Sequence, residues 1–277
     1  MKAAIARGLR RAKLLGLADN ILMRVEPLRN FRARRRFSQL NPDFTLPPTA
    51  LAYDAFGRWE PEIYRQQGSA HAAYIASLIK RHRPGARVIC EWGCGPMRVL
   101  RHMPSHFEKE RLIGIDYNPR TIAWCTRHFA RMQFITNALE PPLPLQDGEV
   151  DAIYAISVFT HLSEQHHRHY VADLMRCLAP GGVLVVTLHC DRYVKKLTES
   201  ERTQFDHGEL VVRAGVTEGK RAYVAFHSPD YVRHLFRGFD ILEHDATEQI
   251  ADFHQDTWVM AKPHDPRPAF NHTPAVG

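Results

Sequence analysis

The 277-residue sequence predicts an α/β fold built on a mostly parallel sheet with helices on both faces. Two observations support this prediction. Between residues 85 and 190, short apolar runs typical of strands alternate with longer segments of helical periodicity, as expected for parallel strands joined by crossover helices. A turn with two glycines also follows the first apolar run, at the position where open parallel sheets bind their ligands.

The elements of this alternation follow one another without internal repeats. A helix with His71, Ile75 and Ile79 on one face is expected to end at "RPG" (83–85). The next predicted elements are strands 87–92, 111–116, 133–136, 150–157 and 183–188, with helices 97–103, 119–130 and 163–178 between them. The segment "APGG" (179–182) is expected to end the last of these helices, because Pro and Gly commonly follow a helix C-terminus.

The pattern changes after residue 190. Two short strand-like runs predict a small β insertion within residues 191–226. Ser228, followed by a proline, predicts the start of another helix. Residues 263–277 contain four prolines and are expected to form a disordered tail. The strands predicted for this part of the chain are 209–216, 220–226, 239–244 and 256–262.

The basic residues of the chain are concentrated at its N-terminus. Residues 1–37 hold eleven Lys and Arg against two acidic residues, so they carry +9, whereas the whole chain carries +7 and the other 240 residues −2. Apolar residues recur there at helical spacing, and Pro27 is expected to break or restart the helix. We expect residues 1–43 to form a basic helical arm. This arm either contacts anionic lipid or an acidic partner, or caps the domain as a solvated helix.

Composition argues against several classes of protein. The sequence has no run of about 20 apolar residues, the length that a membrane-spanning helix requires. Arg7, Arg10 and Arg11 interrupt any apolar core of a secretory signal, and a transit peptide is disfavoured because no serine precedes Ser38. The five cysteines lack the paired spacing of zinc ligands. We therefore predict reduced thiols, no metal site and a cytoplasmic location.

The first strand, "VICEW" (88–92), opens directly into a turn with glycines at positions 93 and 95. A backbone without side chains at these positions can approach a ligand closely. A dinucleotide site usually has a third glycine three residues further on, where this chain has Arg98. The carboxylate of Glu91 would repel a pyrophosphate and attract a cation. The turn therefore fits a positively charged ligand that carries no phosphates.

Polar side chains also end the next two strands. Asp116 lies 21 residues beyond the second glycine, where a carboxylate is placed to accept hydrogen bonds from ribose hydroxyls. Asn137 ends the third strand with an amide that can pair with an adenine edge. A cationic, phosphate-free nucleoside that carries an amino acid is S-adenosylmethionine, which we predict as the cofactor. Alternatively, Glu91 is a charge partner of Arg98, and Asp116 caps the helix that begins at Pro119.

At four motifs the sequence resembles the class I S-adenosylmethionine-dependent methyltransferases. The motifs are "VICEWGCGP", "LIGIDYNP", "QFITNALEPPLPLQDGEVDAIYAISVFTHL" and "LAPGGVLVVTLH", in the family's order. The resemblance is firm over residues 85–190 and looser over 44–84 and 225–262. It implies a Rossmann-like sheet of seven strands, the last of them antiparallel, in a methyltransferase domain over residues 44–262.

The resemblance also implies how the cofactor's methionine part is held. Glu91 and the two glycines, Gly93 and Gly95, would frame the methionine, with Cys94 as the spacer between the glycines. Ser157, after the fourth strand, would face the site of methyl transfer.

On the nucleoside side, the resemblance implies that Asp116 holds the ribose hydroxyls. Tyr117 would pack on the adenine, or alternatively serve only as a half-buried packing residue. Asn137 and Ala138 would lie near the adenine edge. The family often has Asp where this chain has Asn137, but an amide can still accept or donate a hydrogen bond.

Methyl transfer to a hydroxyl requires a group that takes the proton. His161 follows the fourth strand, where the cleft is expected, and imidazole titrates near neutrality, so we predict His161 as the general base. Alternatively, it caps the helix that begins near Ser163. His166, His167 and His169 lie on that helix and are expected to face solvent. Other histidines expected to point toward the same rim are His189, His227 and His254.

The loop "SVFTHL" and the later "HSPDYVRHLF" resemble bacterial methyltransferases of surface-polysaccharide and secondary-metabolite pathways. We therefore predict a small polar acceptor, a hydroxyl of a sugar, glycolipid or secondary metabolite, with residues 191–226 shaping the acceptor cleft. The chain would be cytoplasmic, with peripheral contact at the inner face of the membrane through residues 1–37. Alternatives are an RNA or DNA methyltransferase and a non-catalytic cofactor-binding module. Adenine-methylating enzymes typically carry (Asp/Asn)-Pro-Pro-aromatic after the fourth strand, which "SVFTHL" lacks, so nucleic acid is disfavoured.

Overall fold

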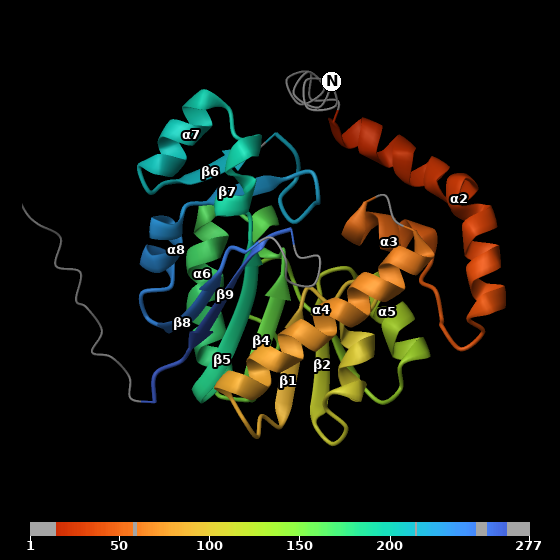
Figure 1. The fold of residues 1–277 in the computed structure, drawn as a ribbon, viewed down its shortest axis with the longest axis horizontal. Helices are drawn as coiled ribbons and strands as arrows, with labels where there is room; N and C mark the ends of the chain where they lie inside the picture. Colours follow the sequence, from red (N-terminus) through yellow and green to blue (C-terminus); the bar gives the residue numbers. More distant parts are fainter. Residues whose placement is uncertain (1–14, 58–59, 214, 248–253, 265–277) are drawn as a thin grey trace, which may run out of the picture.

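A seven-stranded sheet forms the centre of the molecule (Figure 1). The computed structural model describes residues 15–57, 60–213, 215–247 and 254–264. The strand order is β3-β2-β1-β4-β5-β9-β8, with β9 antiparallel to both of its neighbours and β1 to β5 parallel. The strands span β1 Val88–Trp92, β2 Arg111–Asp116, β3 Gln133–Thr136, β4 Val150–Ile156, β5 Leu178–Leu188, β8 Asp240–Asp245 and β9 Asp256–Ala261. The predicted seven-stranded sheet with an antiparallel last strand is confirmed.

The register of the parallel strands brings the functional motifs to one edge. Glu91 lies opposite Gly114 of β2 and Tyr154 of β4, so the ends of β1, β2 and β4 lie side by side. The strand order reverses between β1 and β4. From β1 the chain adds β2 and β3 on one side of the sheet, and it then crosses to the other side, where it adds β4 and β5. A crevice at this reversal is where open parallel sheets bind ligands.

Helices cover both faces of the sheet, as predicted, and each face has its own apolar core. On one face, α4 (Pro61–His82), the 3₁₀ helix η1 (Leu100–Ser105) and α5 (Pro119–His128) pack on the strands. On the other face, α6 (Glu164–Cys177) and α8 (Pro229–Leu235) do so. This burial on both faces is why β1, β4 and β5 are nearly continuous apolar runs in the sequence.

Two predicted element boundaries were wrong. Residues 97–103 do not form an α-helix, because the chain leaves the glycine turn with Met97 at φ +69° and continues into η1, which contains Pro104. The segment 179–182 follows the end of α6 at Cys177, as predicted, but the strand predicted from residue 183 begins earlier, so these residues are part of β5. There the Gly181 N–H donates to the Lys262 carbonyl and the Lys262 N–H donates to Gly182, so backbone pairing continues past the end of β9.

The N-terminal helix α2 (Leu15–Leu40) continues through Pro27, contrary to the expected break. A proline removes one helical hydrogen bond and bends a helix, and Figure 1 shows α2 bending partway along its length. Phe37 is buried and packs edge-on against Phe44, and Arg34 donates to the Pro47 carbonyl at 3.0 Å. The second half of α2 therefore packs on the domain, whereas residues 1–14 lie outside the described part.

The segment after β5 forms a separate layer above the sheet edge (Figure 1). It contains η3 (Asp191–Lys196), α7 (Glu199–Asp206) and a two-stranded antiparallel ladder of β6 (Leu210–Arg213) and β7 (Val224–His227). The predicted β insertion is confirmed, as is the cap at Ser228, whose hydroxyl accepts from the Tyr231 N–H. The predicted tail falls mostly outside the described residues.

Two further expectations concern membrane-spanning helices and the state of the cysteines. None of the described helices is long and apolar enough to cross a membrane. All five cysteines are buried free thiols, as the sequence predicts.

Candidate functional site

The glycine turn after β1 lies under the open end of the sheet. Gly93 has φ +77° and Gly95 φ +48°, a backbone conformation that favours glycine. A Cβ on Gly93 would lie 2.5 Å from a methyl carbon of Val158, so this position also has no room for a side chain. The N–H groups of Gly93 and Cys94 both donate to the Ile115 carbonyl, at 2.8 and 3.0 Å. These bonds tie the turn to β2.

The Asp116 carboxylate joins the turn to the end of β2. One oxygen accepts from the Gly95 N–H and the other from the Asn118 N–H, both at 2.9 Å. Burial raises the pKa of Asp116 to about 6. The alternative role as helix cap is filled by Asn118, whose side chain accepts from the Arg120 N–H. Each Asp116 oxygen keeps further lone pairs for a ligand.

A hollow opens above these groups. It brings together seven of the ten predicted site residues, which come from the ends of four different strands. They are Gly93, Gly95, Asp116, Tyr117, Asn137, Ser157 and His161.

The other three predicted residues do not line this hollow. Glu91 lies in the core, where its carboxyl accepts from the Tyr154 hydroxyl at 3.0 Å and burial raises its pKa to about 8. No ion pair joins Glu91 to Arg98 among the described residues; a guanidinium nitrogen of Arg98 instead lies 2.7 Å from a ring nitrogen of His71. The Cys94 side chain is buried. Ala138 contributes its carbonyl, which accepts from Asn137 and Tyr170.

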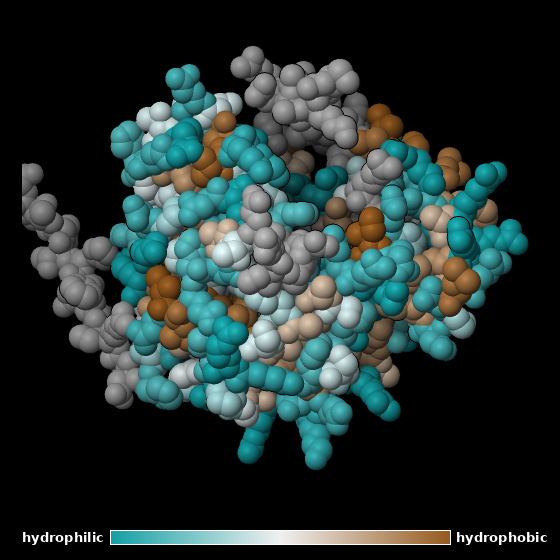
Figure 2. All heavy atoms as spheres, in the orientation of Figure 1, coloured by the Kyte–Doolittle hydropathy of each residue, from teal (hydrophilic) through white to brown (hydrophobic). Residues whose placement is uncertain are grey.

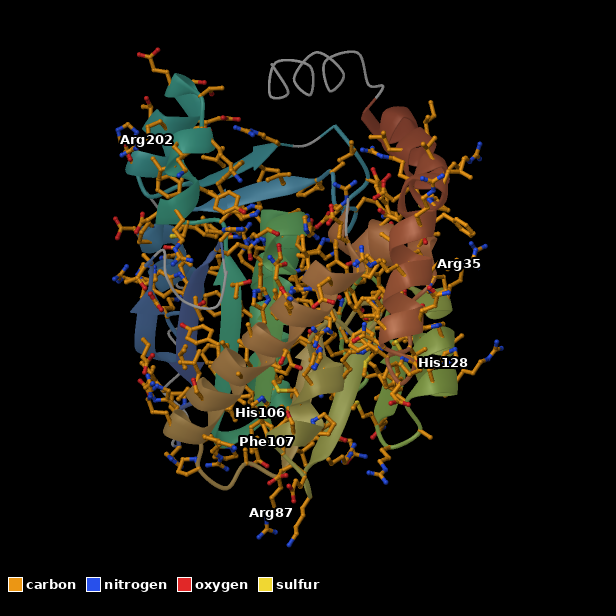
Figure 3. The ribbon with its side chains drawn as sticks, turned by 45° about the vertical axis from the view of Figure 1, so that its right-hand side comes forward. Arg35, Arg87, His106, Phe107, His128 and Arg202 are labelled. Atoms are coloured by element: carbon orange, nitrogen blue, oxygen red, sulfur yellow. The ribbon has the colours of Figure 1, made fainter. Side chains whose placement is uncertain are left out.

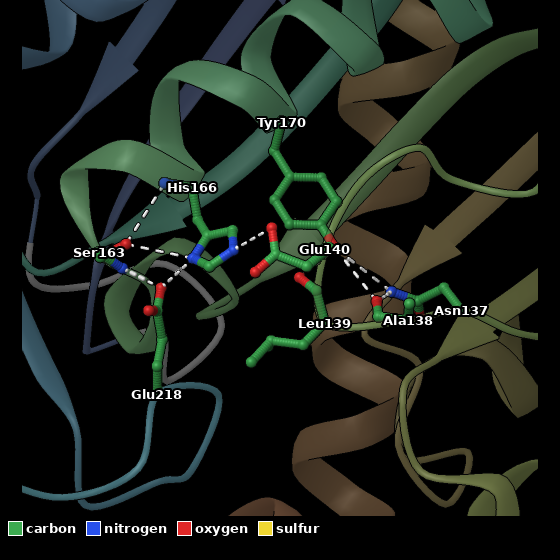
Figure 4. A network of polar contacts seen from close by, with 8 residues as sticks. All are labelled: Asn137, Ala138, Leu139, Glu140, Ser163, His166, Tyr170 and Glu218. Carbon is green, nitrogen blue, oxygen red and sulfur yellow. Dashed lines mark hydrogen bonds and ion pairs between the residues drawn. The ribbon is translucent and has the colours of Figure 1, made fainter.

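Polar groups of Asn137, Ala138 and Tyr170 meet in the wall at the end of β3 (Figure 4). The Asn137 amide nitrogen lies 3.5 Å from the Tyr170 hydroxyl, which itself donates to the Leu139 carbonyl at 2.8 Å. The Asn137 amide oxygen is buried and has no hydrogen-bond partner among the described residues. A buried polar atom without a partner is costly, so this oxygen fits a ligand that donates an N–H.

A loop from the insertion closes over the same wall. His166 lies between Glu218, at 2.6 Å, and Glu140, at 2.9 Å, and Figure 4 shows the two carboxylates on opposite sides of the ring. Burial disfavours the charged imidazole, but the two carboxylates outweigh it and raise the pKa of His166. The predicted solvent-facing position was wrong for His166 and His167, which are both buried. The ring nitrogens of His167 are hydrogen-bonded to the Tyr231 hydroxyl and the Phe159 carbonyl. The prediction is correct for His169, which is exposed.

Ser157, directly after β4, is one of the two described non-glycine residues with a positive φ, at +63°. Its N–H donates to the Thr187 hydroxyl at 2.9 Å, and its own hydroxyl is bonded to Thr160 and to the Gln255 amide, at 2.8 and 2.7 Å. A left-handed backbone at a non-glycine residue is strained and persists where surrounding bonds hold it. These bonds hold the Ser157 backbone at the mouth of the hollow.

His161 has a fixed ring orientation. Its Nδ1 lies 2.7 Å from the Tyr223 carbonyl, so Nδ1 carries the proton and donates. Among the described residues no hydrogen bond reaches Nε2, which is therefore the basic nitrogen. Burial lowers the pKa of His161, so the ring is neutral near pH 7.

A second hollow adjoins the first. Arg98, Ser157 and His161 line both, so they lie where the two meet. Two of the three histidines expected at the rim, His189 and His254, line the second hollow, whereas His227 is buried against His167. Residues that the sequence reasoning missed come from α3 (Thr49–Phe56) and the insertion, namely Leu51, Asp54, Ala55, Phe56, Gly219 and Arg221. No motif marks them, because each reaches the hollow only through the packing of distant segments.

A parallel sheet whose order reverses beside a glycine turn and a buried carboxylate defines a Rossmann-like α/β domain with a hollow at the point of reversal. Comparison with known proteins agrees. Residues 89–182 match the family described as "Methyltransferase domain". Over these residues the chain is similar to the class I S-adenosylmethionine-dependent methyltransferases, whose methyl donor is S-adenosylmethionine, and the residues that line the hollow fit that group.

Curated relatives match in the same region. A trans-aconitate 2-methyltransferase from an Acidovorax species is 29% identical over 134 residues, which cover 47% of this chain and 49% of that protein. A probable S-adenosylmethionine-dependent methyltransferase from Mycolicibacterium smegmatis is 32% identical over 106 residues, covering 38% of this chain and 39% of that protein. The chain thus spans about half or less of the length of these relatives.

Solved structures share the fold at low sequence identity. DesVI from Streptomyces venezuelae has a TM-score of 0.52 at 17% identity and covers 72% of this chain and 92% of its own. A 1,6-didemethyltoxoflavin-N1-methyltransferase from Burkholderia thailandensis has a TM-score of 0.53 at 14% identity and covers 83% and 90%. That structure holds 1,6-didemethyltoxoflavin and S-adenosylhomocysteine.

Proposed function

We propose that this chain transfers a methyl group from S-adenosylmethionine to a hydroxyl of a small polar acceptor, a sugar, glycolipid or secondary metabolite. The observation that carries the proposal is the position of His161. Its side chain lines both hollows, and its Nδ1–H is held by the Tyr223 carbonyl. The cofactor occupies the first hollow and the acceptor the second, so the basic Nε2 lies where the two meet.

The chain's own groups then have distinct tasks. S-adenosylmethionine, when bound, supplies an electrophilic methyl group. Asp116 accepts hydrogen bonds from the ribose, and Asn137 pairs with the adenine edge. His161 accepts the proton of the acceptor hydroxyl, a contribution typically worth about 10²–10⁴-fold in rate. Ser157, held by Gln255 and Thr160, positions the acceptor against the methyl donor.

The relatives support a small acceptor. The Acidovorax relative is a trans-aconitate methyltransferase, and the Burkholderia thailandensis structure holds 1,6-didemethyltoxoflavin. Neither of these two proteins is named as a nucleic-acid methyltransferase. The alternative of a non-catalytic module is disfavoured by the half-buried, neutral His161, because a module that only binds the cofactor needs no base.

The test is transfer of a radiolabelled methyl group from S-adenosylmethionine into a small-molecule extract. We expect label in a low-molecular-weight product with the wild-type chain and a loss of about 10²–10⁴-fold with His161→Ala. The matched control is His169→Ala on exposed surface of α6, which should keep full activity. Cofactor binding without label in any small-molecule fraction would support the non-catalytic module, and label in nucleic acid would support the other alternative.

We further propose that α2 contacts an anionic membrane surface from the cytoplasmic side. Its exposed face carries a row of apolar side chains among basic ones: Ile21, Val25 and Leu28 follow helical spacing and are 53%, 42% and 81% exposed. The opposite face is turned inward although it is partly polar, with Glu26 and Asn30 buried and hydrogen-bonded to each other at 2.9 Å. An exposed apolar row on a basic helix is the pattern of interfacial helices.

Arginines accompany this row. Figure 2 shows apolar side chains along the outer side of α2, and Figure 3 shows Arg35 pointing away from the body of the molecule. The exposed arginines of α2 are Arg24, Arg29, Arg32, Arg35 and Arg36. Each basic residue near an anionic surface contributes about 1 kcal/mol to binding, so anionic lipid complements this face better than a second, equally basic copy of the chain.

Vesicle flotation tests this contact. Wild type should bind phosphatidylglycerol-containing vesicles and not pure phosphatidylcholine. A triple variant with Ile21→Gln, Val25→Gln and Leu28→Gln should lose most of the binding. Ile63→Gln, which removes a similarly exposed side chain from α4, is the control. If the triple variant instead binds vesicles as wild type does and differs only in the mass measured by sedimentation, α2 is an interface between copies of the chain and the membrane proposal is wrong.

A further inference from the structure

The second hollow is walled on one side by the β insertion. His189, Tyr193 and Phe226 form an aromatic surface there, with the His189 and Tyr193 rings stacked 4.0 Å apart. Two cationic groups lie on this surface. The Lys196 ammonium is 3.7 Å from the centre of the Tyr193 ring, and the Arg213 guanidinium is 4.7 Å from that of Phe226.

The charges lining this hollow are unbalanced. Among the described residues, its basic side chains are Arg98, Lys196, Arg213 and Arg221, and its single acidic one is the exposed Glu60. Arg98 and Arg221 also line the first hollow, where they can serve the carboxylate of the cofactor. Lys196 and Arg213 line only the second hollow, so they are the cations available to the acceptor.

Arg213 acts mainly as a support for Lys196. The carboxylate of Glu201 accepts from Arg213 at 2.8 and 2.7 Å, which neutralises the guanidinium charge. Arg213 also donates to the Lys196 carbonyl at 2.7 Å, which fixes the end of η3. Among the described residues no carboxylate forms an ion pair with Lys196. Burial, followed by the charges of Lys195 and Arg213, lowers the pKa of Lys196, as expected of an ammonium without an acidic neighbour.

His189 adds no charge of its own. Its Nδ1 lies 3.2 Å from the Ala225 carbonyl, and burial lowers its pKa to about 3, so the ring is neutral at all physiological pH values. Its Nε2 can therefore accept a hydrogen bond from an acceptor hydroxyl. This surface thus offers one hydrogen-bond acceptor beside one uncompensated cation.

We infer that the second hollow binds its acceptor through an anionic group, a carboxylate or a phosphate, paired with Lys196, while the hydroxyl to be methylated points toward Ser157 and His161. This inference rests on the proposed function and narrows its acceptor class. An ammonium is placed to form a charge-assisted hydrogen bond with an oxyanion, the stronger kind of hydrogen bond. A neutral sugar bound against this wall would provide no counter-ion for Lys196.

The experiment uses the full chain, labelled S-adenosylmethionine and a small-molecule extract separated by anion exchange into a bound, anionic pool and a neutral flow-through. Label should enter only the anionic pool. Lys196→Gln should raise the KM for that pool about tenfold, equivalent to about 1.4 kcal/mol, with kcat and the Kd for S-adenosylhomocysteine unchanged. Lys196 is exposed at the edge of the hollow, and Lys195→Gln, which changes its equally exposed neighbour outside the hollow, is the matched control and should behave as wild type.

Treatment of the anionic pool with alkaline phosphatase distinguishes the two sources of charge. Loss of acceptance identifies a phosphate and retention identifies a carboxylate; both support the inference. Label in the neutral flow-through, or equal KM values for Lys196→Gln and Lys195→Gln, overturns the anionic acceptor and leaves the proposed methyl transfer intact. Absence of label in both pools, despite cofactor binding, overturns the proposed function and this inference with it.

Discussion

The carboxylate of Asp116 accepts a hydrogen bond from the backbone N–H of Gly95 at 2.9 Å, which links the end of β2 to the glycine turn after β1. The two residues are 21 positions apart in the sequence, and each was predicted separately to contact the cofactor. Their contact shows that Asp116 shapes the turn, and under the proposed function we expect its remaining lone pairs to accept hydrogen bonds from the ribose.

Replacement of Asp116 should therefore affect both the cofactor and the turn. We expect Asp116→Ala to weaken S-adenosylhomocysteine binding by about 1.5–3 kcal/mol, the range for hydrogen bonds to charged groups. Asp116→Asn keeps one oxygen acceptor and should lose less. Isothermal calorimetry gives the affinities, and thermal unfolding reports on the turn. An unchanged affinity in Asp116→Ala would remove this residue from the binding site.

The lowered pKa of His161 predicts how kcat/KM depends on pH. A general base works in its neutral form, and burial lowers the pKa of His161 below its ordinary value of 6.5. The kcat/KM of the wild type should therefore rise with pH, reach half its maximum below pH 6.5 and be flat from pH 7 to 8. His161→Ala should lose this acid limb together with its activity and bind S-adenosylhomocysteine as well as wild type. An acid limb that persists in His161→Ala would assign it to another group.

The sequence was most informative where function depends on local order. The turn residues Gly93 and Gly95 and the strand-ending Asp116 could be predicted because a strand, a turn and a carboxylate at fixed spacing form one compact unit. The strain at Ser157 could not, because it is held by Thr187 and Gln255, which lie 30 and 98 residues further along the chain.

Other features of the site also depend on long-range packing. The sequence pattern of α6 alone predicts that His166 and His167 face solvent. In the structure, Glu218 of the insertion contacts His166 and Tyr231 of α8 contacts His167. No motif marks Lys196 either, since the role that we infer for it depends on the absence of a paired carboxylate among the residues that the structure describes.

The raised pKa of His166, which contacts Glu218 of the insertion loop, predicts how the stability of the folded chain depends on pH. Its pKa in the folded chain is raised above the ordinary 6.5, so its stabilising contribution is complete below pH 6.5 and is lost as pH rises through the raised pKa. The unfolding temperature of the wild type, relative to His166→Gln, should therefore decrease between pH 6 and pH 9. Differential scanning fluorimetry at several pH values measures it. A constant difference would show that charge on His166 does not contribute.

Glu91 should also make the folded chain less stable as pH rises, because burial disfavours its charged form. Burial raises the pKa of Glu91 from its ordinary 4.5 to about 8, so the folded chain loses stability as pH rises from about 4.5 to about 8, and the loss is complete above that value. Glu91→Gln should unfold at a higher temperature than wild type at pH 9, by roughly 2–4 °C for each kcal/mol, and at about the same temperature at pH 4. Equal unfolding temperatures at pH 9 would show that the Glu91 carboxyl is not destabilised by ionisation.

Gly68, in the middle of α4, should tolerate no side chain. A Cβ at this position would lie 2.0 Å from the backbone oxygen of Arg98, so helix and turn are in direct contact. Gly68→Ala gains about 1 kcal/mol of helix propensity, yet overpacking against a backbone atom costs about 1–3 kcal/mol and shifts Arg98. We expect a lower urea midpoint together with weaker S-adenosylhomocysteine binding. Ser69→Ala, on the exposed side of the same helix, should leave binding unchanged and stabilise slightly. If Gly68→Ala is as stable as Ser69→Ala, the close approach of α4 to the turn is wrong.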